Sequence, residues 1–542
     1  MNKVINEIYA EAVKSYEKYI MQVFTNNFPF IGVPFKGYRA ILDNPYDRFE
    51  QCIVNLNLNE KKYDTNEEKN SFFIKLSKSI LDEIYSILKK IEKEKILLYF
   101  YSFSVCNKRI GEKFVKYQMN GCNQEFDDNN ITKFIDRIIK TALIINQKHE
   151  DYITEIERYF ATQEDGIELL VKIIANLEEN ENSGKTDITF DMIKDLLVLS
   201  FVLILIINTR QDLTKGINKN ANFSTDINGK IEVENLEMDL TDLDVSNYNY
   251  KFDENWNEYN EKLFLELDNG VYNKCGFYLY DVKLISDLFC FKDNVIIETK
   301  ELYINKIIGL GIEKERANKL FEYFTYKNSQ ENINEKNLYK YINYANNNMI
   351  NSKIFIQYKD GLYICYNYLI RYAAELFRGI VASNPKKYVD HNTFEQITQG
   401  FVNDVEAELK GKFPKAKTKK NYYCSQDREI DIVCILKDKI YLIECKRPKF
   451  TLDNNEMENG YSKIMKEYMT QLEEEREAFE SNKEKILNEF SREGLISINF
   501  KEKYEIKPLL VIKEFSPIHL QEKTFPILMK DTLITYIKND IK

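Results

Sequence analysis

The chain has 542 residues, too many for one hydrophobic core, and 44% of them are hydrophobic, as in soluble globular proteins. Its formal net charge of -10 argues at first against nucleic acid as a partner. The first residues mix acids and bases, unlike a signal peptide, and nine scattered cysteines without a C-x-x-C pair indicate reduced thiols, so we expect a cytoplasmic protein.

Residues 1 to about 220 are expected to form a helical domain, because apolar residues recur at spacings of three and four. The pattern is clear over 71–103, 130–147 and 165–180. The longest apolar run, Leu196 to Ile207, is shorter than the roughly 18 residues that a membrane-spanning helix needs. We therefore expect a buried helix there and no membrane association.

An acidic stretch at 221–262 is rich in Asn, Asp and Glu, and we expect a solvated loop or mobile linker. An alternative is a mimic of nucleic acid that covers a basic groove until a target arrives. Between Asp226 and Glu261 the stretch has eleven acids and two bases, so the rest of the chain is close to neutral. Local charge, and not the total, decides which surface can meet phosphate.

Residues 263–384 are expected to be helical again, with one β-hairpin. "LYINKIIGLGIEKERANKLFEYF" indicates two helices joined at Gly309 to Gly311, either as an ordinary helical hairpin or as a helix-turn-helix. "KIFIQYKDGLYICY" at 353–366 predicts the hairpin, with Asp360-Gly361 at its turn.

From about 385 the pattern changes to a helix, three strands, a long helix, a strand and a helix. Thr393 and Gln396 have the spacing of a capping box at the start of the first helix. The later elements are expected at 421–425, 430–436, 440–446, 458–490, 507–515 and 525–539.

Three charged residues lie in the two apolar strands at 430–436 and 440–446. They are Asp431, Glu444 and Lys446. Side chains alternate between the faces of a strand, so Glu444 and Lys446 share a face. A two-residue turn between the strands places Asp431 directly opposite Glu444. A turn shifted by one residue places Asp431 opposite Lys446 and diagonal to Glu444.

Directly opposed carboxylates, with Cβ atoms about 5 Å apart, would repel each other unless a cation lay between them. Carboxylate oxygens, the backbone carbonyl of Cys445 and water suit Mg²⁺ or Mn²⁺. Lys446 can then orient or help deprotonate an attacking water. The three histidines lie far apart in sequence, so this chemistry would hydrolyse phosphodiesters without histidine. The alternative is a Lys-Glu-Asp ion cluster at a sheet edge.

The segment 390–515 resembles the PD-(D/E)XK nuclease superfamily, in the αβββαβ arrangement of restriction-endonuclease-like domains. Asp431 matches the first acid of the motif, and Glu444-Cys445-Lys446 matches (D/E)-x-K. Ile430 stands where the motif's name has Pro. The resemblance implies a Mg²⁺- or Mn²⁺-dependent nuclease that leaves 5′-phosphate ends.

The resemblance also implies a role for the leading helix, whose glutamate often completes the metal shell; here that residue is Glu395. The alternative is a first-turn acid favoured by the helix dipole. Some branches carry a Gln and, four residues later, a Tyr on the helix after the motif. Gln471 matches the first of these, but position 475 is Glu, so no role is assigned to Gln471.

Basic residues gather beside the proposed site. We expect them to contact the nucleic-acid backbone, with a solvated loop as the alternative. The expected nucleic-acid-binding residues are Lys412, Lys415, Lys417, Lys419, Lys420, Arg447 and Lys449.

These features predict a multidomain protein with a large helical N-terminal region, and with an α/β restriction-endonuclease-like domain at 385–542. The expected function is metal-dependent nuclease activity on nucleic acid, with DNA favoured over RNA, in bacterial restriction or anti-phage defence. The helical region would recognise a target, assemble copies or partner subunits, or restrain the nuclease. The alternatives are an RNA endonuclease toxin, a scaffold with a nuclease fold that binds without cutting, and a helical assembly protein.

Overall fold

The structure is a computed structural model. It describes residues 2–25, 45–120, 152–177, 186–214, 220–234, 267–289, 295–326, 333–338, 353–366, 377, 381, 385–446, 467–497, 504–512 and 525–541. The expected helix at 130–147 lies outside these ranges.

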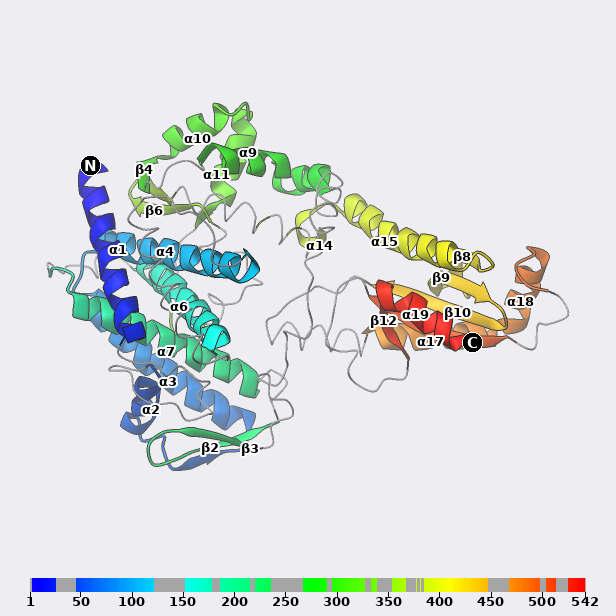
Figure 1. The fold of residues 1–542 in the computed structure, drawn as a ribbon, viewed down its shortest axis with the longest axis horizontal. Coiled ribbons are helices and arrows are strands. Elements are labelled where there is room, and N and C mark those ends of the chain that lie inside the picture. Colours follow the sequence, from blue (N-terminus) through cyan, green and yellow to red (C-terminus); the bar gives the residue numbers. More distant parts are fainter. Residues whose placement is uncertain are drawn as a thin grey trace. The chain divides into compact units, whose positions relative to one another are not determined.

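The chain forms two compact units, each assembled from two separate stretches of sequence (Figure 1). The first unit joins Met1–Tyr250 to Gly276–Arg378, and the second joins Lys251–Cys275 to Gly379–Lys542. Helices predominate, and each unit also contains sheet. Within the described ranges no helix is long and apolar enough to cross a membrane.

The first part of unit 1 is a helical bundle, as the spacing of its apolar residues predicted. Its helices are α1 (Asn2–Thr25), α2 (Pro45–Asn55), α3 (Asn66–Leu88), α4 (Lys93–Asn120), α6 (Tyr152–Ala175) and α7 (Phe190–Thr214).

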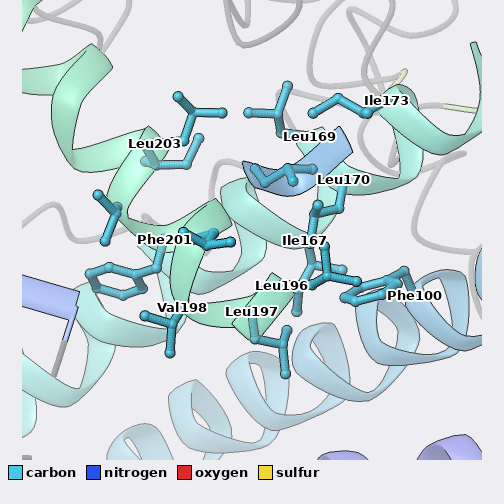
Figure 2. Close-up of a cluster of buried hydrophobic side chains, with 14 of the residues drawn as sticks. Phe100, Ile167, Leu169, Leu170, Ile173, Leu196, Leu197, Val198, Phe201 and Leu203 are labelled. Carbon is cyan, nitrogen blue, oxygen red and sulfur yellow. The ribbon is translucent and has the colours of Figure 1, made fainter. Parts of the chain in front are cut away.

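The core of the bundle lies where α4, α6 and α7 meet, and it confirms the expected buried helix. Figure 2 shows the contact, with Phe100 of α4, Leu170 of α6 and Leu197 of α7 among its members. The run from Leu196 to Ile207 is buried throughout. A helix that is apolar on all sides needs such a position, because no face of it can meet water favourably.

The apolar pattern at 71–103 forms two helices, and not one. Helix α3 ends at Leu88, and the amide of Ile91 then closes a turn on the carbonyl of Leu88 at 3.1 Å. The turn lets both helices bury their apolar faces in one core. Helix α3 begins with a capping box, in which the Thr65 hydroxyl accepts from the Glu68 amide and the Glu68 carboxylate accepts from the Thr65 amide.

The acidic stretch is not wholly a loop. Within it, β2 (Asn222–Thr225) and β3 (Ile231–Glu234) form an antiparallel hairpin, and β2 also pairs with β1 (Lys61–Tyr63). Phe223 and Ile231 are buried in the bundle core, which explains why this part of the polar segment is ordered as strand. Residues 235–266 lie outside the described ranges.

The second part of unit 1 contains both features that the sequence predicted there, the joined helices and the β-hairpin. Helices α10 (Lys300–Ile308) and α11 (Lys314–Tyr323) are separated by a glycine-containing turn, and Gly361 at the hairpin turn has φ +70°. The other elements are α9 (Leu279–Phe289), β4 (Val295–Thr299), β5 (Thr325–Tyr326), β6 (Phe355–Lys359) and β7 (Leu362–Tyr366), and the sheet order is β4-β7-β6-β5.

Unit 2 follows the expected order of helix, three strands, helix, strand and helix, with one short strand, β12, added before the last helix. Its elements are α14 (Pro385–Tyr388), α15 (His391–Lys412), β8 (Lys417–Tyr423), β9 (Glu429–Leu436), β10 (Lys439–Lys446), α17 (Met469–Ser481), α18 (Lys483–Arg492), β11 (Glu505–Ile512), β12 (Ile527–Met529) and α19 (Lys530–Asp540). The sheet order is β12-β11-β10-β9-β8; β8, β9 and β10 are antiparallel, and β10, β11 and β12 are parallel.

Helices cover both faces of this sheet. Apolar residues of α15 and α19 share one cluster with Ile432, Cys434 and Ile443. Apolar residues of α17 and α18 share another with Val433 and Leu442. Because side chains alternate along a strand, Glu444 and Lys446 follow Leu442 onto the α17 face.

Several local expectations for unit 2 were wrong. The first strand, β8, begins at Lys417 and not at 421, so most of the lysine run lies in α15 and β8 and not in a loop. The last helix begins at Lys530 and not at 525, because residues 527–529 form β12.

Asp390, and not Thr393, caps α15, because its carboxylate accepts from the Thr393 amide at 3.1 Å. Thr393 therefore lies within the first turn. The expected single helix at 458–490 is divided at Asn482 into α17 and α18.

Candidate metal and catalytic site

The β9–β10 hairpin confirms the first of the two predicted registers. A two-residue turn joins the strands, and Lys437 in it has φ +56°. Leu436 pairs with Lys439, and the last recorded pair is Ile432 with Ile443. The next position in this register is Asp431 opposite Glu444. The sequence left two registers open, and the observed turn selects the one that aligns the two acids.

Asp431 is fixed by the strand opposite it. The backbone amide of Cys445 donates to Oδ2 of Asp431 at 2.7 Å. Burial raises the pKa of Asp431, although this hydrogen bond and the charge of Lys446 oppose the effect. The Asp431 carboxylate is thus fixed by a hydrogen bond to its Oδ2 atom.

Glu444 is more deeply buried than Asp431, with 1% of the residue exposed. Its Oε1 atom accepts from Nζ of Lys446 and, at 2.8 Å, from Nε2 of Gln471. Burial and the charge of Asp431 raise its pKa well above the usual value, while Lys446 opposes the shift. No other described residue makes a hydrogen bond to its Oε2 atom.

Lys446 stays charged beside the acids. Burial would lower its pKa, but the charge and hydrogen bond of Glu444 and the charge of Asp431 raise it above the usual value. Its Nζ atom also lies 5.5 Å from the ring centroid of Tyr468, at the start of α17. A lysine held in this way can donate hydrogen bonds to an anionic ligand but cannot easily give up a proton.

Helix α17 brings Gln471 and Glu475 to the site. Gln471 contacts Glu444, although its sequence context alone assigned it no role. Sequence reasoning missed Glu475, which is 1% exposed and accepts from Nε2 of Gln471 at 2.7 Å. A signal was present, since Glu475 lies at helical spacing between Leu472 and Phe479 and so falls within an apolar stripe.

The structure does not bring Glu395 to the acid pair. Helix α15 packs on the other face of the sheet, and the Glu395 side chain is 64% exposed, with Oε1 3.6 Å from Nδ1 of His391. The buried acid of this helix is Glu406, which accepts from Thr418 at 2.6 Å and pairs with Lys410 at 2.8 Å. A metal-binding role for Glu395 stays a prediction.

The expected nucleic-acid-binding residues fall into three groups. Lys419 pairs with Glu489 at 2.6 Å and with Glu493 at 2.8 Å, and Lys420 pairs with Glu406 at 3.3 Å. Exposed residues for which no ion pair is recorded within the described ranges are Lys412, Lys415 and Lys417. The residues that lie outside those ranges are Arg447 and Lys449.

Asp431 and Glu444 offer oxygen atoms of the kind that a hard divalent cation prefers. Asp431 and Glu444 supply carboxylate oxygens, and the buried Oε2 atom of Glu444 has no partner among the described residues. The described side chains do not, however, form a complete ligand set, since no three His, Cys, Asp or Glu residues among them are grouped so that they could hold a metal ion. Cation binding is therefore a proposal about these residues.

Comparisons with known proteins identify no relative: no family model, no curated protein and no solved structure matches this chain.

Proposed function

We propose that unit 2 is a metal-dependent nuclease that hydrolyses phosphodiester bonds of nucleic acid. The observation that carries the proposal is the register of one hairpin, which continues from the Ile432–Ile443 pair to place the partly buried Asp431 opposite the buried Glu444, with Lys446 bound to Glu444. Carboxylates in an apolar sheet cost free energy unless hydrogen bonds, a charged partner or a ligand compensates them, and a bound cation would compensate both acids at once. The sequence resemblance to PD-(D/E)XK nucleases and the αβββαβ order of elements support the same function.

Each residue has a distinct role in this proposal. Asp431 and Glu444 would hold Mg²⁺ or Mn²⁺, with the Cys445 carbonyl as a further oxygen ligand. A bound cation would lower the pKa of a coordinated water and stabilise negative charge on the phosphorus. Lys446, held by Glu444, would donate hydrogen bonds to the attacking water or to a phosphate oxygen.

DNA is the proposed substrate, on the strength of the resemblance, and a bacterial restriction or anti-phage role is proposed on the same ground. The exposed residues Lys412, Lys415 and Lys417 would contact the phosphate backbone. Lys419 and Lys420 already pair with acids, so they would contribute less. Such contacts are independent of sequence and weaken as salt rises.

The test incubates full-length protein with labelled single- and double-stranded DNA and RNA, in Mg²⁺, Mn²⁺ or EDTA. Asp431→Asn and Lys446→Met should each lower cleavage by on the order of 100-fold or more, because the first removes a charged metal ligand and the second removes the donor to the attacking water or phosphate oxygen. Asp438→Asn is the matched control, since Asp438 is an exposed acid in the turn of the same hairpin. It should cut as the unchanged protein does.

The other outcomes identify the rival functions. Cleavage that survives both site substitutions would show that the acids and lysine are not catalytic. Cleavage confined to RNA would favour an RNA endonuclease toxin. Tight binding of DNA without cleavage, in the presence of metal, would favour a scaffold with a nuclease fold.

A further inference from the structure

Tyr423 is 60% exposed, more than any other large aromatic residue in the described part of the chain. It is the last residue of β8, the strand at one edge of the sheet in unit 2. Its hydroxyl group is hydrogen-bonded to the carboxylate of Glu429, the residue that pairs with it on β9. The ring is therefore fixed at its tip, while most of its surface meets solvent.

The exposure of Tyr423 follows from a break in the alternation of β8. Lys419 and Tyr422 both donate to Glu489 of α18, at 2.6 Å and 3.2 Å. In a regular strand, residues three apart point to opposite faces. Asn421, which lies between them, has φ +49°, a left-handed conformation that interrupts the alternation. Tyr422 therefore takes the buried position beside α18, and Tyr423 is left exposed.

Positive charge precedes this ring along the chain. The exposed residues Lys412 and Lys415 lead into β8, and Lys417 is exposed at its first position. Three positive charges are thus followed by an exposed aromatic ring on one edge of the sheet. Proteins that bind single-stranded nucleic acid combine these two features, because the charges follow the backbone and the rings stack on the bases.

Helix α17, on the other side of the proposed site, is unfavourable for a polyanion. Its thirteen residues include five glutamates and one arginine. The arginine, Arg476, already pairs with Glu473 at 2.5 Å, and Glu477 and Glu480 are exposed. Negative charge on this helix repels phosphate, so we expect a nucleic acid to reach the site along β8.

The register of the sheet places Tyr423 close to Asp431. Tyr423 pairs with Glu429, which precedes Asp431 by two residues in β9. Because a strand rises about 3.3 Å per residue, this separation is roughly 7 Å along the strand. A base on the ring of Tyr423 and a phosphate near Asp431 can therefore belong to one short stretch of a single strand.

We propose that the β8 edge binds single-stranded nucleic acid, with Lys412, Lys415 and Lys417 on its phosphates and Tyr423 stacked on an unpaired base. The inference deepens the proposed function and rests on it, because it names the form of substrate that would reach Asp431. The base must be unpaired and unstacked, since a base inside a duplex is covered by its neighbours. Stacking and phosphate contacts are common to DNA and RNA, so the experiment includes both.

The experiment measures binding of labelled oligonucleotides to the full-length protein in EDTA by fluorescence anisotropy, so that neither a cation nor cleavage is needed. Single strands of DNA and of RNA are compared with the DNA duplex of the same sequence, and at least one single strand should bind more tightly than the duplex. Tyr423→Leu should weaken binding of that strand about 5- to 100-fold, because the stacked ring is lost. Tyr423→Phe keeps the ring and should bind nearly as the unchanged protein does.

Salt dependence separates the ring from the lysines. Lys417→Gln should reduce the slope of log affinity against log salt concentration by about 0.7, the value for one phosphate contact with a single strand. Tyr423→Leu should leave this slope unchanged, because a stacked ring releases no counterions. The matched controls are Tyr280→Leu, at an exposed position of α9, and Lys485→Gln, at an exposed position of α18; both should bind as the unchanged protein does.

Thermal unfolding accompanies each binding measurement. Every replaced side chain is exposed, so each variant should unfold at nearly the same temperature as the unchanged protein. Weaker binding by Tyr423→Leu then reports a lost contact and not a lost fold.

Two results would overturn the inference alone, provided that Asp431→Asn still abolished cleavage. They are tighter binding of the duplex than of either single strand, and unchanged affinity of Tyr423→Leu. The competing role of the β8 edge is to pair with a second copy of the chain. A dimer in sedimentation that Tyr423→Leu dissociates, with affinity for single strands kept, would assign the edge to that role instead. If the protein bound neither single strands nor duplex, the proposed function would fail as well.

Discussion

The carboxylate of Glu444 is held by the protein on one side only. Its Oε1 atom accepts from Lys446 and Gln471, while Oε2 has no partner among the described residues. This asymmetry is what a ligand-binding carboxylate needs, because the side chain is fixed before the ligand arrives. Gln471 contributes to this arrangement, since its amide donates to Oε1 of both Glu444 and Glu475.

Replacing Gln471 tests this at the scale of one residue. Gln471→Met keeps the length of the side chain but removes the donor, so Oε1 of Glu475 loses its recorded donor and Oε1 of Glu444 keeps only Lys446. We expect a loss of about 1–3 kcal/mol in the free energy of unfolding, measured in urea without metal. Gln396→Met, at an exposed position of α15, should change stability by less than about 0.5 kcal/mol. Equal effects of the two substitutions would contradict the role of Gln471.

At the scale of elements, the sequence predicted what local rules determine. Alternation predicted that Asp431, Glu444 and Lys446 share a face, while the register that aligns Asp431 with Glu444 was one of two left open until the turn was known, because strand register follows from turn length. Most of the order of helices and strands in unit 2 was also predicted, because the spacing of apolar residues within a segment distinguishes a helix from a strand. The charges in the two apolar strands suggested metal-assisted hydrolysis of phosphodiesters, and the resemblance added the expectation of a nuclease; both stay predictions.

Features that depend on tertiary packing were not predicted. Glu395 and Glu475 are both acids on helices, and nothing local distinguishes the exposed one from the buried one except the stripe that surrounds Glu475. The position of α17 beside Glu444 follows from the packing of Leu472 and Phe479 against the strands. That packing brings together residues about 30 positions apart, which periodicity along one element cannot show.

Helix α19 is attached to the sheet at Asp540, and the attachment should depend on pH. Partial burial would raise the pKa of Asp540, but hydrogen bonds from Lys439 at 3.0 Å and Tyr441 at 2.9 Å lower it below the usual value. An acid whose pKa is lowered in the folded state stabilises the fold at pH values above its pKa in the unfolded state, which is about 3.9. This stabilisation is lost as the pH falls through the pKa of the acid in the folded state.

The unfolding temperature of Asp540→Asn, compared with that of the unchanged protein at several pH values, therefore tests the direction of this effect. The variant should unfold at a lower temperature than the unchanged protein at pH 7, and the difference should shrink as the pH falls below about 4. Asp438→Asn, in the exposed turn, should show no difference at either pH. A difference that grew towards low pH would contradict the assigned contacts.

At the scale of the whole molecule, unit 2 is not one continuous stretch of sequence. The helical residues 267–275 also belong to it. Nδ2 of the Asn273 side chain donates to Oδ2 of Asp390 at 3.1 Å, and the backbone amide of Asp390 donates to the backbone carbonyl of Gly270 at 3.3 Å. A Cβ atom at Gly270 would lie 2.7 Å from Cγ2 of Thr393, so the close approach requires glycine. A fragment that begins at residue 385 would lack these contacts at the start of α15.

Each unit has its own hydrophobic core, so we expect two thermal transitions in calorimetry of the full chain. Leu170→Ala in the core of unit 1 (Figure 2) and Leu442→Ala in the core of unit 2 each remove a fully buried side chain. Each substitution should cost about 2–5 kcal/mol and lower the midpoint of one transition only, a different one in each variant. Leu302→Ala, at a half-exposed position of α10, is the control and should move neither transition appreciably. If both core substitutions lowered one shared transition, the units would unfold together, and a nuclease unit that folds on a core of its own would be excluded.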